Sequence, residues 1–146
     1  MFKKWNDWAP LPLRVVISLS YTAAGFLKLF TANGHQNFVF ELGHWGVFGA
    51  IANALAWFVG ALEFGSGLLL IVGAYVSLVA IVQTLGTIGL VIGIYIGGLP
   101  PAYDGLDYFP YALPDVSYSL AIIAGLLTLL FGGAGKYSVD GRRKSS

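Results

Sequence analysis

The chain has 146 residues, of which 57% are hydrophobic and only 10% are charged. Soluble domains carry about 25% charged residues, so this chain lacks the polar groups that a water-facing surface requires. It contains no cysteine, which excludes disulfides, thiolate nucleophiles and iron–sulfur ligation by this chain alone. The length predicts one domain, residues 1–146.

Four apolar segments are each close to the ~20 residues that span a hydrocarbon core. They are expected at about 12–31, 51–73, 75–97 and 116–133. We therefore predict an all-α fold, an integral membrane four-helix bundle in contact with the lipid bilayer.

The connecting segments have distinct compositions. Residues 32–50 mix aromatic and polar side chains and are predicted to form a short segment lying in the membrane interface between the first two spans. The second and third spans are almost continuous, which predicts a turn near Gly73 to Val76 and a tight antiparallel hairpin. Residues 98–115 contain four prolines and three aspartates and are predicted to be a loop, not a helix.

Basic residues gather on the side of the two chain ends. The connectors on the opposite side contain no Lys or Arg. The positive-inside rule then predicts that both termini are cytoplasmic, in a bacterial cytoplasmic (inner) membrane. The basic residues on the terminal side are Lys3, Lys4, Arg14, Lys136, Arg142, Arg143 and Lys144.

Five polar residues within or at the ends of the spans form a candidate intramembrane site. An ionisable group at the membrane centre costs at least ~2.5 kcal/mol, so each one needs a reason. Helical spacing places three of them on one stripe of the first span, which must then face the bundle. The five residues are Arg14, Tyr21, Lys28, Glu63 and Gln83.

Two interpretations of Glu63 stay open. At ~1.5 Å rise per residue, Tyr21, Glu63 and Gln83 fall at a similar depth, near the middle of the membrane. The carboxylate would either pair with Arg14 or Lys28 and join two helices, or serve as a ligand or proton site.

Glycines at helical spacing on the second and third spans are predicted to form a glycine seam. Small residues at such positions let helix backbones approach closely in membranes. The seam consists of Gly60, Gly67, Gly86, Gly89 and Gly93.

No metal site is expected. His35 and His44 bracket Glu41, but this spacing matches no metal pattern, and we expect both histidines to face solvent. No histidine lies inside a predicted span, so a haem held by two histidines is not supported by this chain alone. No cofactor is evident, although an apolar slot with a few hydrogen-bonding groups would suit a quinone. No nucleic-acid partner is expected.

Several short motifs are distributed along the chain: Gly25-x-x-Lys28-Leu29, Ala56-Trp57, Gly65-x-Gly67-Leu-Leu-Leu and Gly135-Lys-Tyr-Ser138-Val-Asp140. Together they resemble one known family, DoxX, over essentially the whole chain. The resemblance implies a small four-helix membrane protein, in a family whose name comes from the membrane subunit of a thiosulfate:quinone oxidoreductase. The matched positions are Arg14, Lys28, Glu63 and, in a closing motif, Gly135, Ser138 and Asp140.

Three functions follow as hypotheses. The first is an accessory, structural or assembly component of a membrane redox complex of respiratory type, with a larger complex or a homo-oligomer as partner. The second is a quinone-interacting oxidoreductase subunit that passes electrons to the quinone pool. The third, transport of a small solute, is less favoured because four short spans leave little room for a pathway. Catalysis by the isolated chain is not expected.

Overall fold

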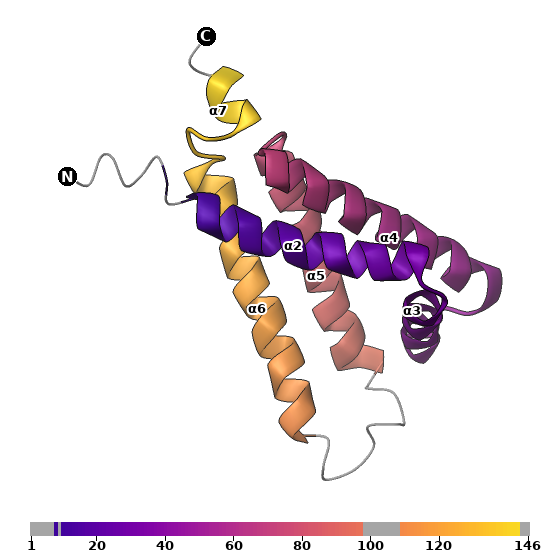
Figure 1. The fold of residues 1–146 in the computed structure, drawn as a ribbon. Helices are drawn as coiled ribbons and strands as arrows, with labels where there is room; N and C mark the ends of the chain where they lie inside the picture. The colour runs from indigo at the N-terminus through magenta and orange to yellow at the C-terminus, as the bar shows by residue number, and fades with distance from the viewer. Residues whose placement is uncertain (1–7, 9, 98–108, 144–146) are drawn as a thin grey trace.

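The structure, a computed structural model, describes Trp8, residues 10–97 and residues 109–143. All regular secondary structure in this part of the chain is helical, which confirms the predicted all-α class (Figure 1). The helices are α2 (Pro10–Phe30), α3 (Ala32–His44), α4 (Gly49–Val72), α5 (Val76–Gly97), α6 (Phe109–Gly132) and α7 (Val139–Arg143).

Three helices are long and apolar enough to cross a membrane, among the residues that the structure describes. They are Pro10–Phe30, Gly49–Val72 and Val76–Gly93, and they correspond to the first three predicted spans. The apolar part of α6, Ser117–Gly132, is shorter. The protein is therefore a membrane protein with three clear candidate spans and one shorter apolar helix.

Helix α3 occupies the segment that the sequence predicted to lie between the first two spans. Only Thr31 separates it from α2, and the Thr31 side chain caps α3 by accepting a 3.1 Å hydrogen bond from the Gly34 N–H. A side chain at Gly34 would place its Cβ 2.7 Å from the Leu27 carbonyl carbon. The glycine therefore permits the sharp corner between the two helices.

The turn between α4 and α5 lies where the sequence predicted it. Gly73 ends α4 in the left-handed conformation, with φ 71°, and the Ala74 N–H donates to the Leu69 carbonyl at 2.9 Å. This arrangement satisfies carbonyl groups that the helix end leaves free. Helix α5 then begins at Val76.

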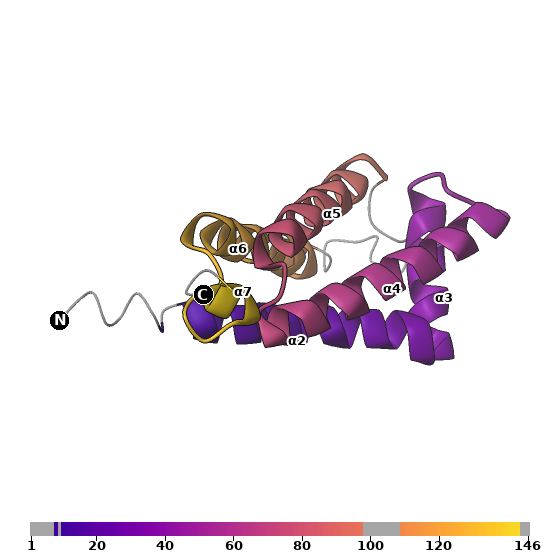
Figure 2. The ribbon, with the colours of Figure 1, turned by 90° about the horizontal axis from the view of Figure 1, so that it is seen from above.

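The prediction that these two helices form a tight hairpin is wrong. Helix α4 packs most extensively against α2, and α5 packs against α6, whereas contacts between α4 and α5 are sparse. Figures 1 and 2 show the α2–α4 pair and the α5–α6 pair meeting near α7 and diverging away from it. The glycines Gly60 and Gly67 of α4 lie against α2.

The buried apolar residues form two clusters. One cluster draws on α2, α4, α5 and α6 and includes Ile17, Leu70, Val79, Leu126 and Leu129. A second cluster lies between α3 and α4 and is formed by Phe38, Leu42, Ala52 and Ala56. The core shared by all four long helices thus excludes α3.

Helix α6 begins earlier than predicted. Residues 109–115 were expected to belong to a loop, but α6 starts at Phe109. Pro110 is compatible with this start because the first residues of a helix donate no intrahelical hydrogen bond. The remainder of the predicted loop, residues 98–108, lies outside the described residues.

The glycine seam is only partly found at helix contacts. A Cβ at Gly60 would lie 3.0 Å from Lys28 Cβ, and one at Gly67 would lie 2.6 Å from the Thr22 nitrogen, so both glycines lie against α2. Gly93 lies against the Trp45 ring.

For Gly86 and Gly89 the prediction does not hold within the chain. Both are exposed, and a Cβ at Gly89 would meet no atom within 4 Å. Glycine spacing identifies a helix face that accepts close packing, but it does not show which helix covers that face.

Candidate functional site

Lys28 on α2 and Glu63 on α4 form an ion pair. Lys28 Nζ donates to Glu63 Oε2 at 2.7 Å, and the two side chains are 15% and 16% exposed. Lys28 Nζ also lies 4.8 Å from the centre of the Phe38 ring on α3. A paired charge is far less costly in a membrane than an isolated one. Of the two partners expected for Glu63, Lys28 is the one observed, and its contacts join three helices.

A series of hydrogen bonds continues from this pair to α5. The Ser66 hydroxyl donates to the Glu63 carbonyl at 3.0 Å and accepts from Gln83 Nε2. Thr87 Oγ1 donates to the Gln83 carbonyl at 2.8 Å, so the Tyr21 hydroxyl must donate to Thr87 in their 2.7 Å contact. We call the side chains of Tyr21, Lys28, Glu63, Ser66, Gln83 and Thr87 the polar network.

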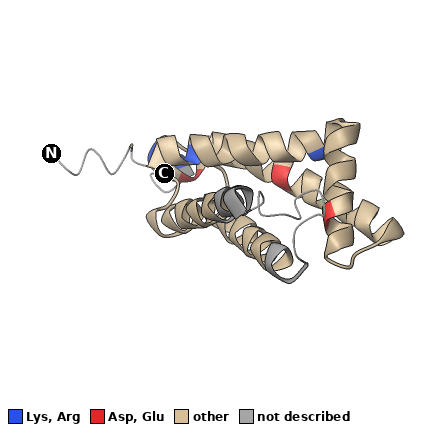
Figure 3. Ribbon diagram, turned by 90° about the horizontal axis from the view of Figure 1, so that it is seen from below, with Lys and Arg blue, Asp and Glu red and all other residues tan. Residues whose placement is uncertain are grey.

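The polar network connects helices and does not form a direct proton path to the carboxylate. Ser66 reaches the backbone carbonyl of Glu63, whereas the Glu63 carboxylate bonds to Lys28. Figure 3 shows how few charged residues lie along the described helices, so Glu63 has few basic residues near it besides Lys28. The arrangement is suited to fixing α2, α4 and α5 relative to one another.

Arg14 lies apart from the other predicted site residues. Its side chain is 2% exposed, and it donates to the Ala134 carbonyl at 2.6 Å and to the Tyr137 carbonyl at 2.8 Å. Those acceptors follow α6, at the end of the bundle where α7 lies. The five predicted residues therefore lie in two places: Arg14 is near α7, and the other four are in the polar network. Depth estimated from the sequence could not predict this, since it does not show that the chain after α6 folds back onto α2.

The sequence analysis missed Ser66 and Thr87. Ser66 lies three residues after Glu63 and Thr87 four residues after Gln83, so each shares a helix face with a predicted residue. This spacing was a usable signal.

The expectation that His35 faces solvent is wrong. His35 Nδ1 donates to the Lys28 carbonyl at 3.2 Å, which satisfies a carbonyl in the last turn of α2. The other ring nitrogen lies 3.2 Å from Asn53 Oδ1, and the ring is 4.6 Å from that of Trp57. His35 thereby fastens the α2–α3 corner to α4.

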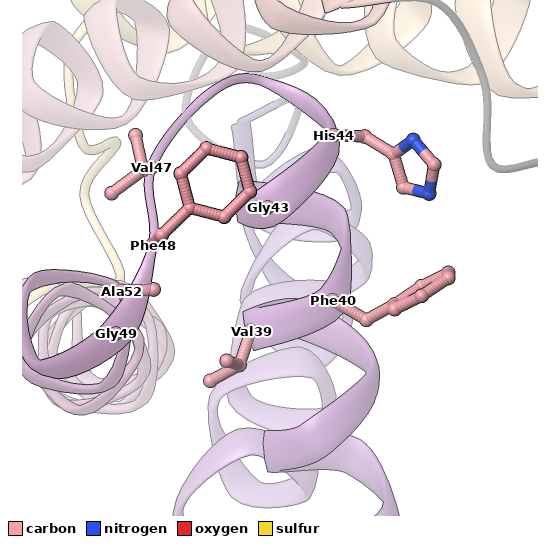
Figure 4. Close-up of a pocket in the computed structure, with 8 residues that line it drawn as sticks. All are labelled: Val39, Phe40, Gly43, His44, Val47, Phe48, Gly49 and Ala52. Carbon is pink, nitrogen blue, oxygen red and sulfur yellow. The ribbon is translucent and has the colours of Figure 1, made fainter.

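A pocket of about 350 Å³ lies between α3 and the start of α4 (Figure 4). Phe40 and His44 project from the same side of α3, with their rings 4.8 Å apart. Apart from His44, the residues that line the pocket are apolar or glycine, and they are Val39, Phe40, Gly43, Val47, Phe48, Gly49 and Ala52. Members of the polar network do not line it. Among the described residues, no three His, Cys, Asp or Glu side chains are grouped so that they could hold a metal ion.

In comparison with known proteins, the chain matches the DoxX family model over residues 9–96. No curated protein and no solved structure shows a significant match. The matched region contains Arg14 and the whole polar network, whereas the closing motif lies beyond it. Since the match covers more than half of the chain, the protein belongs to the DoxX family.

Proposed function

We propose that the protein is a structural or assembly subunit of a larger membrane redox complex. The observation that carries this proposal is the use of the polar network within the chain. Lys28 and Glu63 neutralise each other, and Tyr21, Gln83, Ser66 and Thr87 bond to one another between helices. Side chains used in this way hold a scaffold together and need no substrate.

The outer surface of α5 supports a role in assembly. Leu85 is 65% exposed and Ile92 is 51% exposed, and Gly86 and Gly89 lie exposed on the same helix. Small residues on a membrane helix let a helix of another chain approach closely. A larger complex or a second copy of the chain would supply that helix.

In this proposal the chain crosses the membrane four times. Helix α6 has 24 residues, enough for ~36 Å at ~1.5 Å per residue, and so reaches across the bilayer in spite of its shorter apolar part. The start of α2 and α7 lie at the same end of the bundle (Figure 1). With the distribution of Lys and Arg, this supports cytoplasmic termini in a bacterial inner membrane.

Labelling of single cysteines tests this topology. Cysteines introduced at Lys136 and at Asn37, both exposed, are expected to react with a membrane-impermeant thiol reagent from opposite sides. The chain has no native cysteine to interfere. Reaction of both positions from the same side would contradict the proposed topology.

A quinone-interacting subunit is the second candidate, with quinone as its cofactor. The feature that favours it is the pocket between α3 and α4, which is apolar apart from His44. Small-molecule sites combine apolar walls with a few placed polar groups. In this candidate, electrons would come from a partner and His44 would donate a hydrogen bond to a quinone oxygen.

Purification in a mild detergent distinguishes the two candidates. A tagged chain is expected to bring down a fixed set of membrane proteins, because its exposed apolar faces are covered in the complex. The same preparation is extracted and assayed for quinone. A chain recovered alone, with quinone bound, would contradict the accessory role and support the second candidate.

A further inference from the structure

Helix α5 has no N-terminal cap in its own sequence. The residue before it is Tyr75, which is left-handed with φ 53° and offers no Ser, Thr, Asp or Asn acceptor. Instead, the Val76 N–H donates to Asp140 Oδ2 at 2.9 Å, across 64 residues of sequence. The Asp140 N–H in turn donates to the Gly73 carbonyl at 3.1 Å. Asp140 thus caps a helix to which it does not belong, and its negative charge suits the positive end of the helix dipole.

Arg14 has the complementary role at the end of α6. After α6 the chain passes through two left-handed glycines, Gly133 and Gly135, with φ 76° and 75°. The buried Arg14 side chain binds the carbonyls of Ala134 and Tyr137 in the same segment. An exposed contact adds to this, since the Trp8 and Tyr137 rings lie 4.1 Å apart.

The segment between these contacts is closed by Ser138. Its hydroxyl donates to the Gly135 carbonyl at 2.5 Å and accepts from the Gly141 N–H at 2.9 Å. Gly73 leaves room for the segment, because a Cβ there would lie 2.7 Å from Arg14 Nη1. The start of α2, the α4–α5 turn and the chain after α6 therefore meet at one point, where the helix pairs converge (Figure 1).

We propose that residues 133–143 form a clasp that sets the angle between the α2–α4 pair and the α5–α6 pair. The clasp binds Arg14 on one pair and the first turn of α5 on the other. Away from the clasp, the pairs are also joined by the hydrogen bonds of Tyr21 with Thr87 and of Gln83 with Ser66, and by the Trp45 ring against Gly93. Release of the clasp lets the pairs rotate about these remaining contacts, so a partner that engages the C-terminal segment changes the angle between the pairs.

Distances between spin labels test the clasp. Cysteines replace Ile51 on α4 and Ile92 on α5, which are 71% and 51% exposed, in the otherwise cysteine-free chain. In lipid bilayers, pulsed electron paramagnetic resonance is expected to give one narrow distribution of distances between the two labels when the clasp is native. Asp140→Ala should lose the narrow peak and shift the mean to longer distance. Asp140→Asn should behave as the native protein, because its amide oxygen still accepts from Val76.

A second label pair controls for general unfolding. Labels at Phe26 and Ile51 lie within the α2–α3–α4 unit and should keep their distribution in Asp140→Ala. If that variant does not fold, Ser138→Ala, which removes two hydrogen bonds inside the clasp but not the cap, should give a smaller shift between Ile51 and Ile92. An unchanged distribution in every folded variant, or equal broadening of both label pairs, would overturn the proposal.

Discussion

Replacement of Gly25 by alanine is expected to disrupt the packing of α2 against α4. A Cβ at Gly25 would lie 2.7 Å from the Gly60 carbonyl oxygen and 2.7 Å from Phe64 Cα. Both neighbours are backbone atoms, which cannot turn aside as a side chain would, so the two helices must move apart. The expected loss of stability is at the upper end of the about 1–3 kcal/mol that overpacking costs. Thermal unfolding in detergent measures it.

Gly65→Ala, on α4, is the matched control. It makes the same chemical change inside a helix long and apolar enough to span a membrane, but a Cβ there would have no other atom of the chain within 4 Å. Its thermal midpoint should equal or slightly exceed that of the native protein, since alanine favours a helix more than glycine does. Equal losses in the two variants would show that the contact between α2 and α4 is not the cause.

Loss of either partner of the Lys28–Glu63 pair is expected to have an effect of similar or greater size. Glu63→Leu leaves the ammonium group of Lys28 without its partner, and Lys28→Met leaves the carboxylate without its own. Removal of one partner of a buried pair costs about 3–5 kcal/mol in soluble proteins. Because both side chains are less than one-fifth exposed, solvent screens this effect little.

The double variant Lys28→Met/Glu63→Leu separates the cost of an unpaired charge from the cost of altered packing. It leaves no charge at the pair, so its thermal midpoint should lie closer to that of the native protein than either single variant does. If the fall in thermal midpoint of the double variant equals the sum of the falls in the two single variants, the two side chains do not depend on each other. In that case the ion pair would not be the link between α2 and α4.

The polar network shows what the sequence could predict and where it stopped. Helical spacing placed Lys28 on an inward stripe, and its low exposure agrees with that. Spacing could not choose between Arg14 and Lys28 as partner of Glu63, because both share the stripe. The choice depends on the segment after α6, which supplies Arg14 with carbonyl acceptors 120 and 123 residues away. Contacts between residues so far apart in the sequence leave no recognisable pattern of neighbouring residues.

The arrangement of the helices was less predictable than their positions. Apolar length located the first three spans, and Gly73 located the turn between α4 and α5. The partner of each helix depends on the fit of particular surfaces, such as Gly25 against the Phe64 backbone. Gly25 was not part of the predicted seam, although it makes one of the closest contacts. Spacing rules give the face of a helix, but not the closeness of its neighbour.

The Lys28→Met/Glu63→Leu variant also gives the most direct test of the central claim, that the intramembrane charges hold the helices together and do not take part in chemistry. The tagged double variant is purified in mild detergent beside the native protein, and its co-purifying proteins and extractable quinone are quantified in one preparation. We predict the same set of partners in the same ratio and unchanged quinone content. A double variant that is as stable as the native protein but has lost its partners or its quinone would contradict the claim.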